Sequence, residues 1–246
     1  MIDLTGKKAL VTGGSRGIGA AIAQMLAEYG ADVAFTFQNS THRAMAVAAS
    51  IETHGRRGIA IQADSADPVA IRRSVDEAVA KLGGLDILVN NAGIALYGAI
   101  AEIKVEDIDA LLAINVRGPI LATQAAIPHL GPGGRVITIG SAGADRIVGS
   151  TGTIYYMTKS ALQSFTRGLA QELGPRDITA NLIQPGSTDT DMNPADGEYS
   201  EFQRNLVPLG RYSAPADIAA AVAFLASPAA RQITGAILNV DSGLNT

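Results

Sequence analysis

The chain alternates short apolar runs with longer segments in which apolar residues recur at helical spacing. The short runs are rich in Val, Ile and Leu and are apolar nearly throughout, which is typical of parallel strands covered on both faces. This pattern predicts strands over 7–13, 31–37, 58–64, 85–93, 135–141, 178–186 and 236–243.

The longer segments have the 3.6-residue period of helices that bury one face. They predict helices over 17–29, 41–54, 68–82, 105–130, 155–173 and 215–226. Strands that alternate with helices in this way pair in parallel through right-handed crossovers. The sequence therefore predicts an α/β fold, with a doubly wound parallel sheet and helices on both of its faces.

The chain shows no repeat, no low-complexity segment and no linker of different composition, so we expect one domain over 1–246. The stretch 187–210 is the only long segment in which the hydrophobic residues follow no clear period. Because a loop of this length in a compact domain is usually a lid or a binding element, we expect it to cover a substrate.

Composition narrows the classes of function. The 246 residues carry a formal net charge of −4 without a basic run, so nothing favours nucleic acid or a membrane surface as partner. The absence of cysteine excludes disulfides and thiolate chemistry, and the three histidines lack metal-ligand spacing, so no metal is expected. With no signal-peptide pattern and no unbroken apolar span, the expected location is the cytoplasm.

A glycine-rich turn, VTGGSRGIG (11–19), follows the first predicted strand and opens the first predicted helix. Gly13, Gly17 and Gly19 allow a tight turn and a close approach to phosphate, and the helix N-terminus supplies free N–H groups and a positive dipole. The spacing differs from G-x-G-x-x-G, and the alternative is a tight loop without a ligand. Its place between a strand and a helix favours a dinucleotide site.

The end of the second predicted strand indicates which dinucleotide is bound. NAD-specific sites of this kind place a carboxylate there for the ribose hydroxyls, whereas this chain has Gln38, Asn39 and Ser40. Arg43 follows closely, and Arg16 lies in the glycine turn. Guanidinium groups suit a 2′-phosphate that a carboxylate would repel, so the sequence predicts NADP(H) over NAD(H). The alternative is that both arginines are simply solvated.

The segment GSTGTIYYMTKSAL (149–162) holds two adjacent tyrosines and then a lysine. Together with TGGSRGIG (12–19), NNAG (90–93), Asn115, Ser141 and the Pro-Gly pair at 185–186, it resembles the short-chain dehydrogenase/reductase (SDR) family over the whole chain. The resemblance implies a Rossmann domain with seven parallel strands and a catalytic tetrad of Asn115, Ser141, Tyr155 and Lys159. It also implies, as is common in the family, a homotetramer.

The chemistry of ketone reduction explains the tetrad. Hydride transfer builds negative charge on the carbonyl oxygen, and a tyrosine hydroxyl, with an ordinary pKa of about 10, is too weak an acid unless a neighbouring ammonium lowers that pKa. Lys159 lies four residues after Tyr155 and three after Tyr156, so helical spacing and the family pattern both make Tyr155 the predicted acid/base. Ser141 is expected to hold the carbonyl oxygen, and Lys159 also to bind the nicotinamide ribose.

Asn115 lies in the long helix predicted over 105–130, four residues before Pro119. Because proline has no N–H, the Asn115 carbonyl cannot receive its ordinary helical hydrogen bond. The resemblance implies that this free carbonyl holds a water that relays protons to the lysine. The alternative is a proline that merely kinks the helix.

The resemblance also assigns contacts with the cofactor and the substrate. Asp64 and Ser65 match the adenine contact, and the segment after the Pro-Gly pair matches the part that holds the nicotinamide amide. The predicted cofactor contacts are Gly13, Ser15, Arg16, Gly17, Ile18, Gly19, Gln38, Asn39, Ser40, Asp64, Ser65, Asn91, Ala92, Gly93, Tyr155, Lys159, Pro185, Gly186, Thr188 and Thr190. The predicted substrate contacts are Ser141, Gly143, Tyr155 and Met192.

Three functions remain open on the sequence. The first is reduction of a small or medium-sized ketone, reversible as alcohol oxidation, and the second is reduction of 3-oxoacyl chains on a carrier protein. Before the strand at 135–141 the chain has few cations for an acidic carrier, with only His129 and Arg135 there and Arg176 further along. The third is regulatory binding of a cyclic dinucleotide, since AGADR (142–146) and DTDMNPADG (189–197) are similar to a subgroup of the family linked to such ligands.

Overall fold

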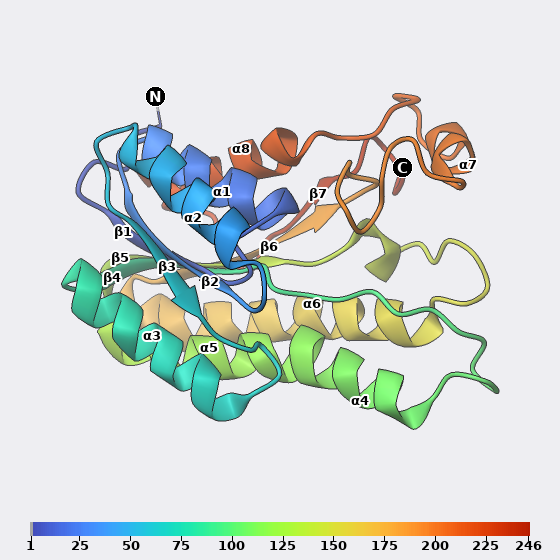
Figure 1. Ribbon diagram of the computed structural model, residues 1–246, viewed down its shortest axis with the longest axis horizontal. Helices are drawn as coiled ribbons and strands as arrows, with labels where there is room; N and C mark the ends of the chain where they lie inside the picture. The colour runs from blue at the N-terminus through green and yellow to red at the C-terminus, as the bar shows by residue number, and fades with distance from the viewer. Residues whose placement is uncertain (1) are drawn as a thin grey trace.

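The fold is built on one parallel sheet. The computed structural model describes residues 2–246, and its seven-stranded sheet has the order β3-β2-β1-β4-β5-β6-β7 (Figure 1). The strands are β1 (Lys8–Val11), β2 (Asp32–Phe37), β3 (Gly58–Gln62), β4 (Leu85–Asn90), β5 (Leu130–Ile139), β6 (Thr179–Pro185) and β7 (Ile237–Val240). Every neighbouring pair is parallel, as the alternating pattern predicts.

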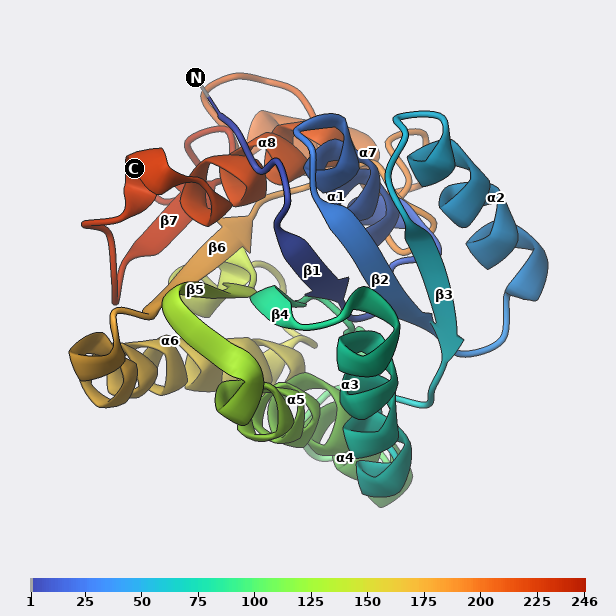
Figure 2. The same cartoon turned by 90° about the vertical axis from the view of Figure 1, so that its left-hand side faces the viewer.

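Helices cover both faces of the sheet. One layer holds α1 (Gly17–Glu28), α2 (Thr41–Glu52) and α8 (Pro215–Ala226). The other holds α3 (Pro68–Leu82), α4 (Val105–Leu112), α5 (Gly118–Ala126) and α6 (Thr153–Leu173), with the sheet between the two layers (Figure 2). The doubly wound fold is thus confirmed.

Each face of the sheet has its own apolar core. Along β2, Phe35 joins the cluster under α1 and α8, whereas its neighbour Ala34 joins the cluster under α3 and α6. Both side chains are fully buried, because successive residues of a strand point to opposite faces. This two-sided burial explains why the strands have nearly continuous apolar runs rather than an alternating pattern.

The long helix expected over 105–130 is interrupted. α4 ends at Leu112, a π-helical turn spans Ala113–Arg117, and α5 begins at Gly118. Within the turn, the N–H of Gly118 donates to the carbonyl of Ala113, five residues back. Pro119, the next residue, has no N–H to restore the α-helical pattern, which gives the interruption a physical cause.

The helical run Val105–His129 as a whole has the length and apolar composition of a membrane span, with a mean hydropathy of 1.3 in its most apolar window. In this fold 44% of that window is buried, and α5 packs against α3 and β4. Its apolar character is therefore explained by its place in the layer of helices that covers the sheet.

Several strands end up to three residues inside their predicted ranges, and three larger or separate differences concern β5, α6 and the segment 187–210. β5 starts at Leu130 rather than at residue 135, since its glycine- and proline-rich beginning concealed the strand and its pairing with β4 is irregular. α6 starts at Thr153, two residues early. A short helix, α7 (Ser200–Asn205), lies within 187–210, because six residues are too few to show a helical period.

Candidate active site

The predicted residues gather at the carboxyl ends of the strands. The strand order reverses between β1 and β4, and in open α/β sheets ligands bind outside the strand ends at such a switch point. The loop that precedes α6 and the segment around α7 reach toward this same end of the molecule (Figure 1). This is where the glycine turn, the tetrad and the predicted lid meet.

The glycine turn has the geometry that phosphate binding requires. Gly13 and Gly17 have φ angles of 68° and 54°, in the left-handed region that favours glycine. A Cβ at Gly19 would lie 2.3 Å from the carbonyl oxygen of Gly13, so no larger residue fits there. Within residues 2–246 no side chain caps the start of α1, which leaves its first N–H groups for an anion.

Thr12 and Asn91 hold this turn against the end of β4. The Thr12 hydroxyl oxygen accepts hydrogen bonds from the N–H groups of Asn91 and Ala92, both at 3.0 Å. In return, Asn91 Nδ2 donates to the carbonyls of Thr12 at 2.9 Å and Gly13 at 3.1 Å. The Asn91 side chain thus supports the turn, and only its backbone remains for the ribose contact that the resemblance implies.

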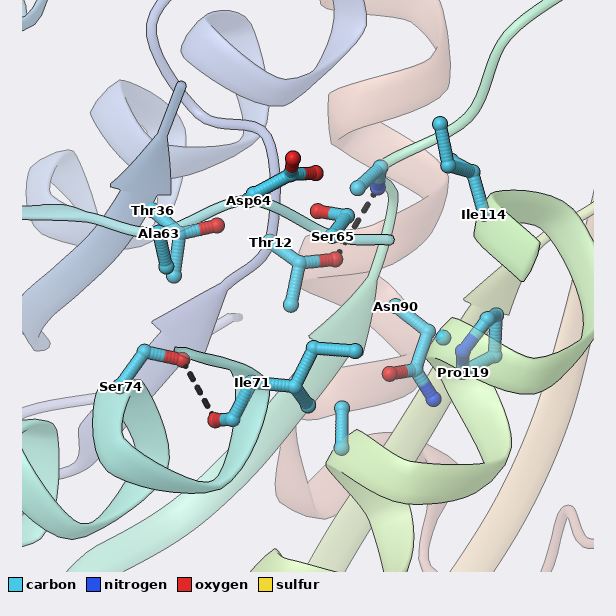
Figure 3. Close-up of a pocket in the computed structure, with 13 residues that line it drawn as sticks. Thr12, Thr36, Ala63, Asp64, Ser65, Ile71, Ser74, Asn90, Ile114 and Pro119 are labelled. Carbon is cyan, nitrogen blue, oxygen red and sulfur yellow. Dashed lines mark hydrogen bonds between the residues drawn. The ribbon is translucent and has the colours of Figure 1, made fainter. Parts of the chain in front are cut away.

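A small cavity lies between the glycine turn, α3 and α5. Its volume is about 20 Å³, and Asp64, Ser65 and Ala92 contribute to its lining (Figure 3). Asp64 Oδ1 accepts a hydrogen bond of 2.8 Å from the N–H of Ala66, which fixes the turn after β3. Asn90 Oδ1 at the base of the cavity is buried and has no hydrogen-bond partner within residues 2–246.

Tyr155 lies in the first turn of α6, among other aromatic rings. Its ring centroid is 5.6 Å from that of Tyr97 and 5.2 Å from that of Tyr156. Burial raises the pKa of Tyr155, Tyr97 and Tyr156 raise it further, and a hydrogen bond with Ser141 opposes the change. The lowered pKa expected from the nearby lysine is therefore wrong for this state of the protein, because desolvation dominates.

Lys159 is 5% exposed, and its Nζ donates a 3.2 Å hydrogen bond to the carbonyl of Ile139, at the end of β5. Nζ lies 6.0 Å from the centroid of the Tyr155 ring. Burial lowers the pKa of Lys159 to about 8. The ammonium is therefore held near the phenol, and it titrates close to physiological pH.

Asn115 lies in the π-helical turn and is 1% exposed. Its Oδ1 accepts from the N–H of Ile94 at 2.9 Å, and its Nδ2 donates to the Ile94 carbonyl at 2.9 Å and to Thr158 Oγ1 at 3.1 Å. A Cβ at Gly93 would lie 3.3 Å from both Asn115 Oδ1 and Lys159 Nζ. The predicted Asn, Lys and Gly are thus packed together, and the Asn side chain has a bracing role.

Ser141 and Tyr156 fix the loop beside Tyr155. Ser141 Oγ accepts a 3.2 Å hydrogen bond from the N–H of Gly143, which leaves its own proton free to donate. The Tyr156 ring fills the space beside Gly143 and Gly152, where an added Cβ would lie 2.0 Å and 2.4 Å from ring atoms. Its hydroxyl donates to the Val148 carbonyl at 3.2 Å. Tyr156 therefore packs against the loop, whereas Tyr155 lies beside Ser141.

The first part of the predicted lid crosses the glycine turn. A Cβ at Gly17 would lie 3.3 Å from Thr190 Cγ2, and Thr188 Oγ1 donates to the Gly186 carbonyl at 3.1 Å. Arg16 and Arg43 both form ion pairs with Asp191, which follows Thr190. Neither arginine is simply solvated in the structure.

The sequence interpretation missed Thr12, Tyr97 and Asp191. Thr12 was within the quoted glycine motif, and its position before the glycines was the available signal. Tyr97 is 58% exposed and follows NNAG in a loop without a period, so only the tertiary contact with Tyr155 reveals it. Asp191 pairs with residues 175 and 148 positions away, which no local pattern indicates.

Comparisons with known proteins agree with this geometry. A family model described as enoyl-(acyl carrier protein) reductase matches residues 13–245. The crystal structure of a short-chain dehydrogenase from Burkholderia cenocepacia in complex with NADP is 55% identical, with a TM-score of 0.98 and 99% of each chain covered. That of a blue fluorescent protein from a metagenomic library, in complex with NADPH, is 51% identical, with a TM-score of 0.97 and 99% and 100% of the chains covered.

A third relative is named for a regulatory function. The cyclic-di-GMP-binding biofilm dispersal mediator protein of Escherichia coli K12 is 43% identical over 237 residues, which is 96% of each chain. Since the family model spans nearly the whole chain and the similar structures match it from end to end, this protein belongs to the short-chain dehydrogenase/reductase family.

Proposed function

We propose that the protein is an NADP(H)-dependent carbonyl reductase that converts a ketone into a secondary alcohol, reversibly. Relatives in its family are named oxidoreductases and reductases. The observation that carries the proposal is the grouping of Tyr155, Ser141 and Lys159 at the strand edge that also holds an uncapped, glycine-rich helix start. A ketone bound beside Tyr155 has two hydroxyl donors for its oxygen, from Tyr155 and Ser141. This is the arrangement that a developing alkoxide requires.

The residues present fit an NADP(H) cofactor. The start of α1 at Gly17 provides uncapped N–H groups for the pyrophosphate, and Arg16 and Arg43 provide cations for a 2′-phosphate. At the other end, Lys159 and the Thr188–Thr190 segment would hold the nicotinamide ribose and amide. When bound, the nicotinamide supplies or accepts the hydride.

The chain's own residues handle the proton. At neutral pH the raised pKa of Tyr155 keeps its phenol protonated, which is the form that a general acid needs in the direction of reduction. Ser141 would orient the carbonyl oxygen through its hydroxyl proton. The Lys159 ammonium, with Nζ 6.0 Å from the centroid of the Tyr155 ring, is the proposed source of the proton that replaces the one Tyr155 gives up. Pro119 has no N–H to give the Asn115 carbonyl its ordinary helical hydrogen bond, which would suit the expected role of this carbonyl in proton supply.

The contacts of two arginines disfavour a substrate that is attached to an acyl carrier protein. Arg135 is 6% exposed and donates to the carbonyls of Gly133 and Gly134. Arg176 donates to the carbonyls of Ile127 and Leu130. Because these guanidinium groups bind the protein's own backbone, they form a poor docking surface for an acidic partner, and a free ketone is the better proposal.

Cyclic-dinucleotide binding is a second candidate, favoured by the name of the E. coli relative. It predicts binding of cyclic di-GMP in titration calorimetry, at a concentration where 5′-GMP produces no heat. The reductase proposal predicts NADPH oxidation in the presence of a panel of ketones. Tight cyclic di-GMP binding by a protein that turns over none of the ketones would favour the regulatory function instead.

The two adjacent tyrosines are expected to respond differently to loss of the hydroxyl. Tyr155→Phe should lower kcat by about 10²- to 10⁴-fold, the usual contribution of a general acid. Tyr156→Phe removes only the hydrogen bond to Val148, worth about 1 kcal/mol, and should keep kcat within about fivefold of the wild type. Steady-state ketone reduction with NADPH measures both, and the assignment of Tyr155 fails if Tyr156→Phe is the inactive variant.

Cofactor preference should depend on the arginines. Arg43→Gln is expected to lower kcat/KM for NADPH about tenfold, since one charge-assisted contact is worth about 1.4 kcal/mol or more, and to leave NADH unchanged. Arg72→Gln is a matched control, because Arg72 is exposed on α3, outside the site. A wild type that uses NADH as well as NADPH, or an unchanged ratio in Arg43→Gln, would contradict the 2′-phosphate assignment.

The pH dependence follows from Lys159 and Tyr155. Because the pKa of Lys159 is lowered from 10.5 to about 8, kcat/KM for ketone reduction should fall as pH rises through about 8, while Tyr155 keeps its proton. The unfolded chain binds this proton more tightly than the folded one, so the free energy of unfolding should rise between about pH 8 and 10.5. A rate that stays constant up to pH 10 would show that Lys159 does not supply the proton.

A further inference from the structure

One lid carboxylate lies between the two arginines of the proposed cofactor site. Asp191 Oδ2 accepts a hydrogen bond from Arg16 Nη1 at 3.4 Å and another from Arg43 Nη1. Arg16 precedes α1 in the glycine turn, and Arg43 lies in the first turn of α2. Three segments far apart in the sequence therefore meet at one carboxylate oxygen.

Two guanidinium groups that converge on one point form a site for an anion, and here the carboxylate of Asp191 occupies that site. Arg43, and to a smaller extent Arg16, holds the pKa of Asp191 below its ordinary value, so the carboxylate is ionised at neutral pH. The residues that follow β2, Gln38 to Ser40, contribute no charge to this corner. Asp191 thus supplies the negative charge that a 2′-phosphate would supply.

We propose that Asp191 is a cofactor-specificity residue: in the free protein its carboxylate occupies the anion subsite of Arg16 and Arg43, and the 2′-phosphate of NADP(H) displaces it. This inference rests on the proposed use of both arginines for the 2′-phosphate. It adds that the protein's own lid competes for that subsite, so that only a ligand with a charged 2′ group separates Asp191 from the arginines.

The balance of charges favours displacement. All three side chains are half exposed, with 61%, 54% and 51% exposure for Arg16, Arg43 and Asp191, and ion pairs of this kind add little stability. A phosphate monoester has a charge of about −1.5 to −2 at pH 7 and three acceptor oxygens, against one charge and two oxygens on a carboxylate. The 2′-hydroxyl of NAD has no charge and leaves the ion pairs intact.

Displacement would also affect the lid. Asp191 directly follows Thr190, the residue that contacts Gly17 over the phosphate-binding turn. While Asp191 binds the arginines, this part of the lid stays joined to the glycine turn and to the start of α2, where the cofactor would bind. Binding of the 2′-phosphate would release that tie, so the first contact with NADP(H) would also free the segment that covers the rest of the cofactor.

The test uses Asp191→Asn, which keeps the size of the side chain and removes its charge. The probe is 2′,5′-ADP, which has the 2′-phosphate but no nicotinamide for the lid to contact, and 5′-AMP is the probe without a 2′-phosphate. Asp189→Asn is the matched control, because it removes the same charge two residues away. Asp189 Oδ1 accepts a 2.9 Å hydrogen bond from the Ala195 N–H, and within residues 2–246 Asp189 forms no ion pair with an arginine.

Titration calorimetry at low salt should show 2′,5′-ADP binding about two- to fivefold more tightly to Asp191→Asn than to the wild type, the factor expected from the loss of a competing exposed ion pair. The affinity of Asp191→Asn for 5′-AMP should equal that of the wild type. Asp189→Asn should bind both probes as tightly as the wild type does. Unchanged or weaker 2′,5′-ADP binding by Asp191→Asn would overturn the inference. So would equal tightening of both probes, which would indicate a general effect on the lid.

The same titrations with Arg43→Gln separate this inference from the proposed function. If Arg43→Gln weakens 2′,5′-ADP while Asp191→Asn leaves it unchanged, the arginine site stands and the competition by Asp191 is refuted. If neither Arg43→Gln nor Arg16→Gln affects 2′,5′-ADP, the arginine site itself is wrong, and the role of Asp191 fails with it. In the double variant Arg43→Gln/Asp191→Asn, the Asp191→Asn change should tighten 2′,5′-ADP binding less than it does alone, because one of the two arginine contacts of Asp191 is already removed.

Discussion

The buried ammonium of Lys159 is the feature around which the site is built. A cation at 5% exposure is costly, and the structure reduces that cost with a hydrogen bond to the Ile139 carbonyl at the end of β5. The neighbouring Gly93 leaves room for both side chains, because a Cβ there would lie 3.3 Å from Lys159 Nζ and from Asn115 Oδ1, which is a tight contact. Asn115 in turn holds the backbone after NNAG through paired hydrogen bonds with Ile94. Through these contacts, the Lys159 ammonium near Tyr155 is linked to the end of β5, the loop after β4 and the π-helical turn.

Much of this could be predicted from the sequence, for reasons that are local. Continuous apolar runs and helical periods predicted every strand of the sheet and its main helices. The prediction of Tyr155 rather than Tyr156 as the acid came from its spacing to Lys159 together with the family pattern. What the sequence could not provide depends on tertiary contacts. The pairing of Asp191 with two distant arginines has no local signal, and α7 is too short for one. The pKa of Tyr155 was expected to fall beside a lysine, yet burial of the phenol and the neighbouring aromatic rings raise it.

The two ends of the proposed cofactor groove follow different physical rules. At the tetrad, charge is buried and held in place, so the energetics depend on desolvation and on hydrogen bonds with fixed partners. At the arginines, charge is exposed and exchangeable, so partners can replace one another at little cost. A lid that is tied at the exchangeable end can respond to the cofactor without disturbing the catalytic end. The proposed acid and the proposed lid thus lie at ends of the strand edge that differ in how their charges are held.

The central claim is that this strand edge transfers a hydride to a carbonyl carbon while Tyr155 supplies the proton. The most direct measurement uses NADPH labelled with deuterium on the transferring face of its C4 carbon, together with a ketone that the protein turns over. Mass spectrometry of the alcohol should find one deuterium on the carbinol carbon for each labelled NADPH oxidised. Oxidation of NADPH without label in the alcohol, or NADPH binding without turnover of any ketone, would contradict the account.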